Sequence, residues 1–511
     1  MNIIRPLLVC AVGLFLTLPL ESYAANRKII IGFHRTPELH EHNVVYGAKG
    51  RVRRNHRQIS ALAVEVPEEE IARLKNDLSV AYVVDDVRVQ PVKAIQTLAP
   101  SSSEYTDSWG VVKIGAETAV NRGFKGAGVK VGIIDSGIDY NHPDLKDNYM
   151  GGYNFVDNNS DPYDDDLISH GTHVAGIIAA KDNSTGVVGV APAASLYAIK
   201  VFGANGSGGD LSTIIAGIEW AINNGMNVVN LSIGLDSIMA PVLQPLRDVC
   251  DLAYQKGIVL VAAAGNESRE RVSIPAAYDS VIAVSATDQN NQRAVFIDPR
   301  NPNIPLSSNI GPEIELTAPG LDIKSTVRGG GYALLSGTSQ SAPHVAGAVA
   351  VVLSAGIKDA NGDGHLTDEV RQRLASTAVD LGTTGRDTIF GWGLVDLAAA
   401  TAQPETHLVH LVRTEGRPKN NAVSVQLTKG FYNVSLVNNG LHKVVVRTSD
   451  SDGMKDDTDL VHVFKKKHRL DTSIEVNIDR DETTMEFVPF GRDGSSAEIT
   501  ITKLTQQAEK K

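Results

Sequence analysis

The sequence predicts an α/β domain built on a parallel sheet with helices on both faces, preceded by a small α+β unit and followed by an all-β sandwich. Between residues 109 and 400, short apolar runs alternate with helical stretches, as buried parallel strands and their crossover helices do. Beyond residue 400 helical periodicity ends and short strand-like runs remain. A polar segment with Pro and Ser, residues 95–105, separates the first two parts.

Length and composition agree with several folding units in a globular protein. The chain has 511 residues, of which 42% are apolar and 21% charged, an ordinary mix for a soluble domain. Its formal net charge of −11 provides no basic surface, so we expect no nucleic-acid partner. No stretch after the N-terminus is long and apolar enough to span a membrane.

Residues 1–24 have the features of a cleaved signal peptide. Arg5 precedes an apolar core at 7–20, and Ser22 and Ala24 supply small residues at the cleavage position. The alternative, a membrane anchor, needs about 20 apolar residues. We therefore expect a secreted protein, extracellular or periplasmic, in which only Cys250 remains and no internal disulfide forms.

The first unit, residues 25–100, combines strands with a helix. Its strand candidates are 28–33, 59–66 and 80–89, and a helix begins at Pro67 with three glutamates in its first turn. In the α/β domain, residues 101–400, we expect strands at 129–135, 228–234 and 258–265 and a helix at 212–225. In the last part, residues 401–511, the strand candidates are GFYNVSLV, HKVVVRT, LVHVFKKK, SIEVNI, TTMEFVPF and AEITITKL.

Three polar residues stand where ligands of a parallel sheet gather, at strand ends and helix starts. Asp135 ends an apolar strand, His170 opens the segment HGTHVAG, and Ser339 lies among small residues before a long apolar helix. Singly, they could be a turn cap, a metal ligand paired with His173, and a helix cap. Together they supply what hydroxyl attack needs: a serine, an imidazole that takes its proton, and a carboxylate that orients the imidazole.

The motifs DSGIDYNHPDL (135–145), HGTHVAG (170–176), AAAGNES (262–268) and GTSQSAPHVAG (337–347) resemble those of the subtilisin-like serine protease family. Asp, His and Ser also follow in that family's chain order. The resemblance covers residues 109–400 and implies the parallel-sheet catalytic fold of that family. One departure is Gln340, where the family commonly has Met, and we expect it to change the packing of the pocket without preventing attack.

The resemblance implies a role for each motif residue. Ser339 corresponds to the nucleophile, His170 to the general base and acid, and Asp135 to the carboxylate that orients His170. Asn266 corresponds to the side-chain donor that stabilises the oxyanion together with the backbone N–H of Ser339. His173 and His344 are expected to have structural roles.

The resemblance also implies how a peptide is bound. Two backbone segments correspond to those that pair with an extended substrate; they are Ser232, Ile233 and Gly234, and Gly206, Ser207 and Gly208. The small residues Ala263, Gly265, Ser273 and Ala276 would line the primary pocket. Glu267 at the rim of this pocket could admit a basic side chain. Asp210 stands where the family often has an aromatic residue, which favours a more open or cation-friendly pocket.

Two segments are candidate calcium sites, since hard cations prefer oxygen ligands. The first follows from the resemblance, although the family's glutamine ligand has no clear counterpart; its ligands would be Asp144 and Asn183 with carbonyls of Lys181, Thr185 and Val187. The second is the loop 359–369, which starts like an EF-hand with Asp359, Asn361 and Asp363. Its glutamate falls at loop position 11 instead of 12, so a solvated acidic turn is the alternative.

The sequence therefore predicts a calcium-stabilised serine endopeptidase that acts on proteins and peptides. The resemblance implies that residues 25–100 are an inhibitory and chaperoning propeptide, self-cleaved between about 95 and 106, and that the enzyme is a monomer. A permanent N-terminal binding domain is the alternative for this unit. For the whole chain, the alternatives are a catalytically silent binding module and a glycan- or surface-binding protein led by the C-terminal domain.

Overall fold

The computed structural model describes residues 26–92, 95–98, 104–204, 209–297, 303–402, 406–412, 422–427, 430–439, 443–449, 462–465, 472–478, 483–490 and 495–504. The expected signal peptide lies outside the described residues. The chain divides into two compact units, residues 1–401 and 402–511. Among the described residues, no helix is both long and apolar enough to cross a bilayer.

An antiparallel sheet of four strands, in the order β2-β3-β1-β4, begins the first unit. Its elements are β1 (Asn26–Phe33), α1 (Leu39–Gly47), β2 (Arg51–His56), η1 (Arg57–Ile59), β3 (Ala61–Pro67), η2 (Glu68–Glu70), α2 (Ile71–Lys75) and β4 (Val80–Asp85). The expected α+β unit is confirmed. The sequence analysis missed β2, whose RVRRNH has no apolar alternation, and α1, whose LHEHNVVYG has no apolar stripe.

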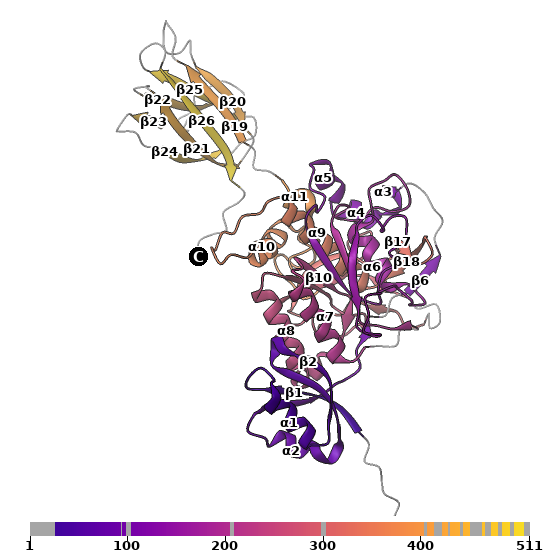
Figure 1. Cartoon of the computed structure of the whole chain (residues 1–511). Coiled ribbons are helices and arrows are strands. Elements are labelled where there is room, and N and C mark those ends of the chain that lie inside the picture. The colour runs from indigo at the N-terminus through magenta and orange to yellow at the C-terminus, as the bar shows by residue number, and fades with distance from the viewer. Residues whose placement is uncertain are drawn as a thin grey trace, which may run out of the picture. The chain divides into compact units, whose positions relative to one another are not determined.

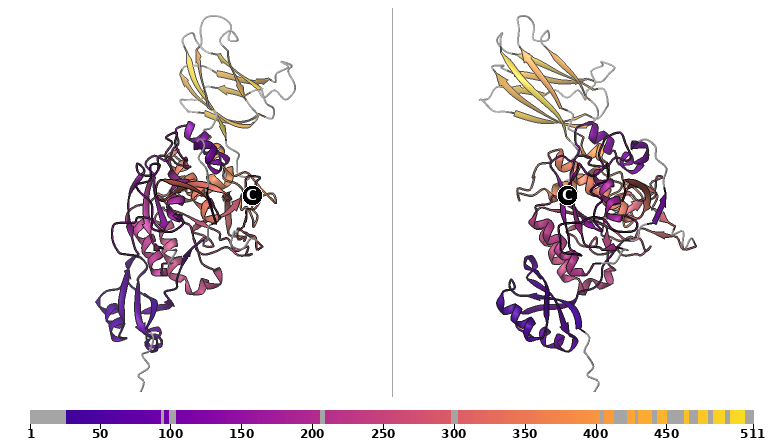
Figure 2. Two further views of the ribbon diagram at one scale, coloured as in Figure 1. Left: turned by 90° about the vertical axis from the view of Figure 1, so that its right-hand side faces the viewer. Right: turned by 45° about the vertical axis from the view of Figure 1, so that its right-hand side comes forward.

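The two faces of this small sheet pack against different partners. Ile29 and Ile31 of β1 join a core with Val45 of α1 and Leu74 of α2. Ile30, which points to the opposite face because strand side chains alternate, joins a cluster that includes residues of α7 and α8. The indigo strands accordingly lie against these helices in the different views (Figures 1 and 2).

The central sheet has seven parallel strands in the order β16-β13-β12-β10-β7-β9-β8, which confirms the parallel α/β prediction. The strands are β7 (Lys130–Asp135), β8 (Tyr149–Asn154), β9 (Ser195–Lys200), β10 (Val228–Leu231), β12 (Val259–Ala263), β13 (Val281–Thr287) and β16 (Ile314–Pro319). The strand order reverses between β7 and β10, and ligands of open parallel sheets bind at the carboxyl ends beside such a reversal. Asp135 is the last residue of β7.

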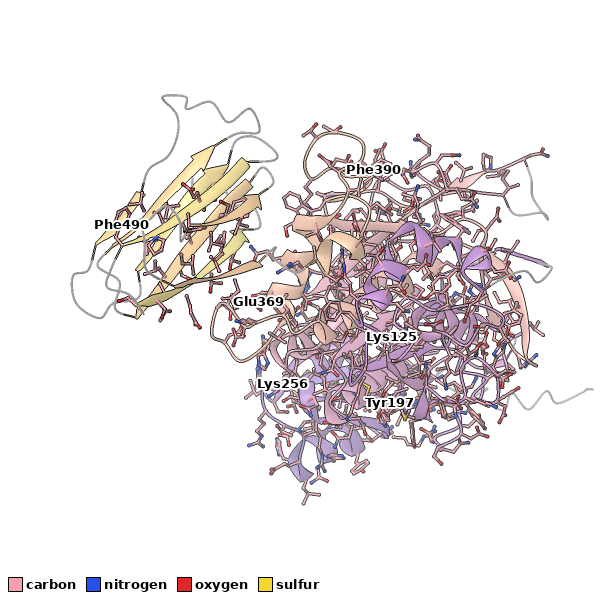
Figure 3. All side chains as sticks on the ribbon, turned by 90° about the horizontal axis from the view of Figure 1, so that it is seen from above. Lys125, Tyr197, Lys256, Glu369, Phe390 and Phe490 are labelled. Atoms are coloured by element: carbon pink, nitrogen blue, oxygen red, sulfur yellow. The ribbon has the colours of Figure 1, made fainter. Side chains whose placement is uncertain are left out.

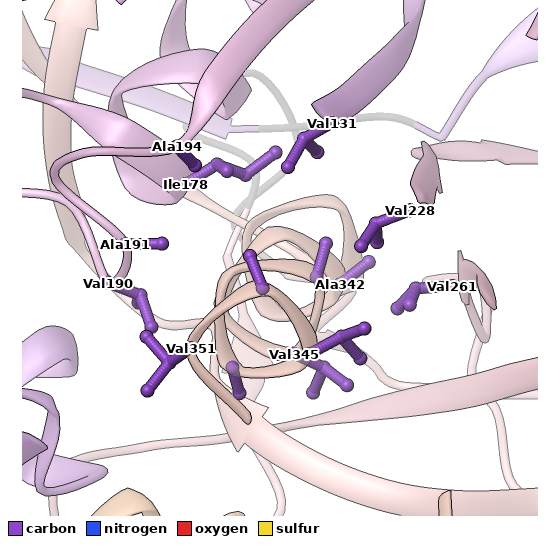
Figure 4. Packing of buried hydrophobic residues seen from close by; sticks show 14 of the residues in the cluster. Val131, Ile178, Val190, Ala191, Ala194, Val228, Val261, Ala342, Val345 and Val351 are labelled. Carbon is purple, nitrogen blue, oxygen red and sulfur yellow. The ribbon is translucent and has the colours of Figure 1, made fainter. Parts of the chain in front are cut away.

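Helices cover both faces of this sheet. The principal ones are α6 (His170–Ala179), α7 (Leu211–Asn223), α8 (Gln244–Gln255) and α9 (Thr338–Ser354). One core joins α6 and α9 to strand residues such as Val131 and Val261, and the other joins α7 and α8 to residues such as Leu260. Figure 4 shows α9 end-on, with Ala342 and Val345 among the surrounding valines. This packing fixes the start of α9, where Ser339 lies.

The first unit contains further strands and helices around the central sheet. They are β5 (Gln90–Pro91), β6 (Ile95–Leu98), α3 (Glu104–Asp107), α4 (Trp109–Lys113), α5 (Ala116–Asn121), β11 (Ile233–Gly234), η4 (Ser237–Val242), β14 (Val295–Phe296), β15 (Leu306–Ser307), β17 (Ile323–Val327), β18 (Gly331–Ser336), α10 (Thr367–Thr377) and α11 (Leu397–Ala400). Two of their pairings involve the segment before α3: β5 pairs with β11, and β6 pairs with β18.

The second unit is a sandwich of two antiparallel four-stranded sheets, as predicted. The sheets have the orders β19-β26-β21-β24 and β20-β25-β22-β23. The strands are β19 (Thr406–Val412), β20 (Val423–Leu427), β21 (Gly430–Asn439), β22 (Lys443–Ser449), β23 (His462–Lys465), β24 (Thr472–Ile478), β25 (Thr483–Phe490) and β26 (Ser496–Leu504). Tyr432 and Phe487, one from each sheet, are fully buried in the core between them. The sequence analysis missed β19 and β20.

Candidate active site

Asp135 and His170 are hydrogen-bonded at the carboxyl end of the central sheet. The ring Nδ1 of His170 lies 2.8 Å from Oδ1 and 2.9 Å from Oδ2 of Asp135. Both residues are buried. Because Nδ1 donates to this carboxylate, the neutral imidazole carries its lone pair on Nε2, which is the arrangement a general base requires.

Burial and charge act on His170 in opposite directions. Burial lowers the pKa of His170, but the charge and the hydrogen bond of Asp135 outweigh it, so the pKa lies above its ordinary value of 6.5. The imidazole therefore becomes a competent base only as the pH rises through a value above 6.5.

A buried network that the sequence analysis missed positions the start of α6. Asp164 accepts hydrogen bonds from the hydroxyls of Thr172 (2.6 Å) and Ser136 (3.0 Å), and Ser136 Oγ accepts one from the backbone N–H of Gly171. Asp166 accepts a 3.3 Å hydrogen bond from the backbone N–H of His170. These contacts connect the residues that flank Asp135 and His170, and so fix the positions of the two side chains relative to each other.

Ser339 lies in the first turn of α9 and is fully buried. Its hydroxyl donates to the carbonyl oxygen of Val92 at 3.3 Å. His170 Nε2 is also buried and has no hydrogen-bond partner among the described residues. The structure thus brings Asp135 and His170 together directly, while Ser339 is engaged with a peptide carbonyl.

Asn266 follows β12 and is held by the residue before Ser339. Its Oδ1 accepts hydrogen bonds from the backbone N–H and from the hydroxyl of Thr338, both at 2.9 Å. These two bonds fix the amide plane and identify which end of it is the donor. The side chain of Asn266 thereby lies beside the peptide unit that carries the backbone N–H of Ser339.

Three further polar side chains are buried in α6 and α9. His173 and His344 are hydrogen-bonded to backbone carbonyls, whereas the Gln340 side chain, within the described residues, is not. His173 donates to the carbonyls of Ile323 and Ala333, and His344 Nδ1 lies 2.7 Å from the carbonyl of Gln340. Burial lowers the pKa of His173 to about 3 and that of His344 to about 4, so both stay neutral near neutral pH. The side chain of Gln340 is fully buried, and neither of its polar atoms has a hydrogen-bond partner among the described residues.

The segment Val87–Val92 lies in an extended conformation between two backbone edges. On one side, Val89 N donates to Gly209 O (2.8 Å) and Leu211 N donates to Val87 O (2.8 Å). On the other side, Gln90 and Pro91 pair with Gly234 and Ile233, and Val92 N donates to Ser232 O (3.2 Å). The predicted segment 232–234 is therefore placed against an extended chain, whereas Gly206, Ser207 and Gly208 lie outside the described residues.

Val92 and Val89 are the two buried side chains of this segment, at 5% and 1% exposure. A Cβ on Gly234 would stand 3.0 Å from Val92 Cγ2 and 3.2 Å from Ser273 Cβ, so Val92 occupies the space that the glycine leaves open. Ala263 and Ala276 are buried in the surrounding clusters. Val92 thus lies near Ser273 and in one apolar cluster with Ala263, two of the residues that were predicted to line the primary pocket.

Asn309, which the sequence analysis missed, braces the loop behind this pocket. It is fully buried, and its Oδ1 accepts from Glu267 N and Arg269 N. Its Nδ2 donates to Glu267 Oε2 at 2.8 Å. Glu267 is itself exposed, and a Cβ on Gly265 would meet Asn309, Ser273 and Glu267. No local pattern around Asn309 signals this role.

The first predicted calcium loop wraps around Asp144, which is 1% exposed. Asp144 accepts from the amide of Asn183 (3.2 Å), Val187 N (3.2 Å) and the hydroxyl of Tyr332 (2.9 Å). Lys181 N donates to the carbonyl of Asp144, and Thr185 N and Oγ1 both donate to Asn183 Oδ1.

Glu104 is a second carboxylate at this loop that the sequence analysis did not identify. It is 6% exposed and accepts from Asn183 N (3.0 Å) and Ser184 N (2.8 Å). Burial and the charges of Asp182 and Asp144 raise its pKa above the ordinary range. Asp144 and Glu104 thus bring two carboxylates, a kind of ligand that calcium prefers, to the same loop. Within the described residues, no cluster of three or more His, Cys, Asp or Glu is arranged to hold a metal.

The second predicted calcium loop precedes α10. Asp359 accepts from Gly362 N and Gly364 N, Asn361 Oδ1 accepts from Asp363 N, and Asp363 Oδ1 accepts from His365 N. Glu369, labelled in Figure 3, accepts from the backbone N–H groups of Ala360 and Asn361. These side chains therefore fold the loop by hydrogen bonding to its own backbone, and the loop holds no second feature that identifies an ion.

Comparison with known proteins gives the family of the chain. The sequence model of the subtilase family matches residues 126–393. The chain is 41% identical over 387 residues to subtilisin NAT of Bacillus subtilis subsp. natto, which covers 74% of this chain and 91% of that protein. It is 42% identical over 343 residues to an alkaline protease of Shouchella clausii, covering 67% and 80%. It is 41% identical over 344 residues to a thermostable alkaline protease of Halalkalibacterium halodurans, covering 67% and 84%.

These matches run through the segments that carry Asp135, His170, Asn266 and Ser339 in the geometry described above. The chain belongs to the subtilase family and is a subtilisin-like serine endopeptidase.

Proposed function

We propose that the chain is the secreted precursor of a serine endopeptidase, in which Asp135, His170 and Ser339 form the catalytic triad and first cut the precursor's own Val92–Lys93 bond. One observation carries this proposal: the hydroxyl of Ser339 lies 3.3 Å from the carbonyl oxygen of Val92. The proposed bond lies before the interval of 95–106 that the sequence analysis favoured. Secretion rests on the features of residues 1–24.

The proposed chemistry follows from the donors and acceptors at the site. Ser339 Oγ attacks the carbonyl carbon of Val92, and its proton passes to His170 Nε2 while Asp135 holds the opposite side of the ring. The C–N bond to Lys93 then breaks as His170 returns the proton to the leaving nitrogen. Water, activated by His170, hydrolyses the resulting ester and frees Ser339.

The reaction also requires that the negative charge developing on the carbonyl oxygen be stabilised. The backbone N–H of Ser339 and the side-chain amide of Asn266 would donate to that oxygen in the tetrahedral intermediate. The two hydrogen bonds from Thr338 prevent the amide of Asn266 from turning over. Preorganised donors of this kind stabilise the transition state without reorganising during the reaction.

The same contacts explain how residues 26–92 would act as an inhibitor after the cut. The new carboxyl end at Val92 would stay in the groove through its backbone pairing with both edges. The four-stranded sheet adds a second contact, in which His56 lies 2.9 Å from Glu219 of α7. A product held at two places leaves slowly, which is how a propeptide inhibits in trans.

We expect the mature enzyme to begin at Lys93. Intact mass and N-terminal sequencing of residues 25–511, expressed in calcium-containing buffer, would measure this directly. Val92→Asp should slow the cut about 100-fold, because an unpaired charge would be buried in the apolar pocket. Gln90→Asp is the matched control, since the Gln90 side chain is exposed and should tolerate the same charge. A mature chain that begins at another residue would refute the assignment of the Val92–Lys93 bond.

We further propose that Asp144, Asn183 and Glu104 bind calcium as a structural ion. Calcium would supply the positive charge that the two buried carboxylates need. The contact between Glu104 and the loop is present in the uncut chain, in which Val92 lies at Ser339. The site is therefore available before processing. The loop 359–369 is the second candidate, with Asp359, Asn361 and Asp363 as ligands.

Removal of calcium should therefore destabilise the uncut precursor. For an ion held at about 1,000 times its dissociation constant, the loss is about 4 kcal/mol, which lowers the Tm by about 10 °C in a domain of this size. Calorimetry of Ser339→Ala with calcium and with a chelator would measure the shift. Asp144→Asn should abolish it and Glu104→Gln should reduce it, whereas Asp182→Asn, an exposed acid paired with Lys125, should keep it. A shift that survives Asp144→Asn and is lost in Asp359→Asn would assign the ion to the second loop.

A further inference from the structure

Asp210 lies beside the substrate groove and is surrounded by cations that all come from residues 26–92. Its Oδ2 contacts Lys28 Nζ at 3.1 Å and an Arg53 guanidinium nitrogen at 2.7 Å, and its Oδ1 contacts Arg88 at 3.2 Å. The Asp210 side chain is 7% exposed. Burial acts to raise the pKa of Asp210, but the hydrogen bonds and charges of Arg53 and Lys28 outweigh it and hold this pKa below its ordinary range. The carboxylate is thus ionised in the precursor.

The three cations around Asp210 differ in what replaces them when residues 26–92 are released. Lys28 and Arg53 belong to the four-stranded sheet, so release of residues 26–92 removes them together with it. Arg88, in contrast, belongs to the extended segment that continues to Val92, and a substrate would replace that segment residue for residue. Only the position of Arg88 is therefore re-occupied when a new peptide binds.

Backbone pairing fixes which substrate residue meets Asp210. Arg88 and Asp210 stand opposite each other in an antiparallel bridge, flanked by the hydrogen bonds Val89 N to Gly209 O and Leu211 N to Val87 O. This is a non-hydrogen-bonded pair, the kind in which opposed side chains come closest. Arg88 precedes Val92 by four positions. The residue that meets Asp210 is therefore the fifth on the acyl side, counting Val92 as the first.

In the precursor, the carboxylate of Asp210 does not cap its own helix. Asp210 stands at the N-cap of α7, but its side chain makes no capping hydrogen bond. In the precursor that role falls to Asp86, which accepts from Ser212 N at 2.8 Å and from Ser212 Oγ at 2.7 Å. The Asp210 side chain is directed instead at the cations along the groove.

The geometry points to Asp210 as a specificity-determining residue that selects an arginine or lysine at the fifth position on the acyl side of the cut bond. This inference rests on the proposed function and deepens it by naming a substrate class. The favoured peptides carry a cation at that position, followed by a branched apolar residue at the fourth and at the first, as Arg88, Val89 and Val92 do. An anion at the fifth position would face Asp210 and be disfavoured.

The test compares two peptides that differ only at the fifth position, on the processed enzyme made from the full chain. Both carry the sequence Val-Gln-Pro-Val before the cut bond and a fluorogenic group after it, and they begin with Arg or with Gln. We expect kcat/KM to be about three- to tenfold higher for the Arg peptide. The difference should shrink as NaCl is raised, because an exposed ion pair is screened.

Asp210→Asn should remove the preference for the Arg peptide over the Gln peptide. Glu117→Gln, which makes the same charge change on the exposed surface of α5, should keep the preference. If the wild-type enzyme cuts both peptides equally, or if Asp210→Asn keeps the preference, the inference is wrong and the proposed function stands. If wild type cuts neither peptide and Ser339→Ala is no less active, the proposed function itself fails. The comparison of the two peptides on wild type needs no variant to fold.

Discussion

Ser339→Ala will abolish peptide hydrolysis and leave the precursor uncut. The substitution removes the only atom that approaches the Val92 carbonyl as a nucleophile in the described active site, while the neighbouring backbone keeps its place at the start of α9. The expected loss in kcat is about 10⁶-fold, a magnitude that was measured in subtilisin itself and is carried over here by family. Binding of peptides should persist, because the groove is formed by backbone that the substitution does not touch.

Intact-mass spectrometry of wild type and Ser339→Ala, both expressed as residues 25–511, would measure the processing. Wild type should split at Val92–Lys93, and the variant should keep its full mass. Ser341→Ala is a matched control, because its hydroxyl donates to the Pro319 carbonyl and lies away from the Val92 carbonyl. Self-cleavage by Ser339 is refuted if the variant is cut at the same bond at a comparable rate.

The residues that could be identified from the sequence share one property: each lies next to an apolar strand or helix that the sequence pattern reveals. Asp135 ends a continuously apolar strand, and His170 and Ser339 each begin an apolar helix. Strand ends and helix starts can be located from hydrophobic pattern alone. The parallel sheet and the C-terminal sandwich were predictable for the same reason, since buried and alternating strands leave their period in the sequence.

The residues that the sequence did not identify depend on partners far along the chain. Glu104 contacts a loop 79 positions away, and Arg88 contacts Asp210 122 positions away. Asn309 braces Glu267 from 42 positions away. A single acid or amide in a loop has no periodicity, so nothing local distinguishes it from a solvated residue. These residues meet their partners only when the folded chain brings distant segments together.

The pH dependence of the enzyme should follow the balance between burial and Asp135 at His170. In wild type the charge of Asp135 holds the pKa of His170 above 6.5, so kcat/KM should fall as the pH drops through that pKa and reach a plateau on the alkaline side. The sign follows from the base role, because protonated His170 cannot accept the hydroxyl proton of Ser339.

Asp135→Asn should cut kcat about 10⁴-fold and shift this acid limb to lower pH. The amide can donate to His170 Nδ1, which would leave the ring proton on Nε2 and turn the base into the wrong tautomer. Loss of the negative charge also leaves burial as the dominant influence on His170, and burial lowers its pKa. Both consequences come from one atom, so they should appear together.

The measurement is kcat/KM from pH 5 to pH 10 for wild type, Asp135→Asn and the control Asp157→Asn, a carboxylate in a surface turn that accepts from Asn154. The control should keep the wild-type profile in height and position. A variant that loses rate without a shift of the acid limb would mean that Asp135 orients the ring without tuning its charge. A variant that keeps the wild-type rate would contradict the assignment of Asp135 to the triad, because the 2.8 Å contact with Nδ1 would then have no part in catalysis.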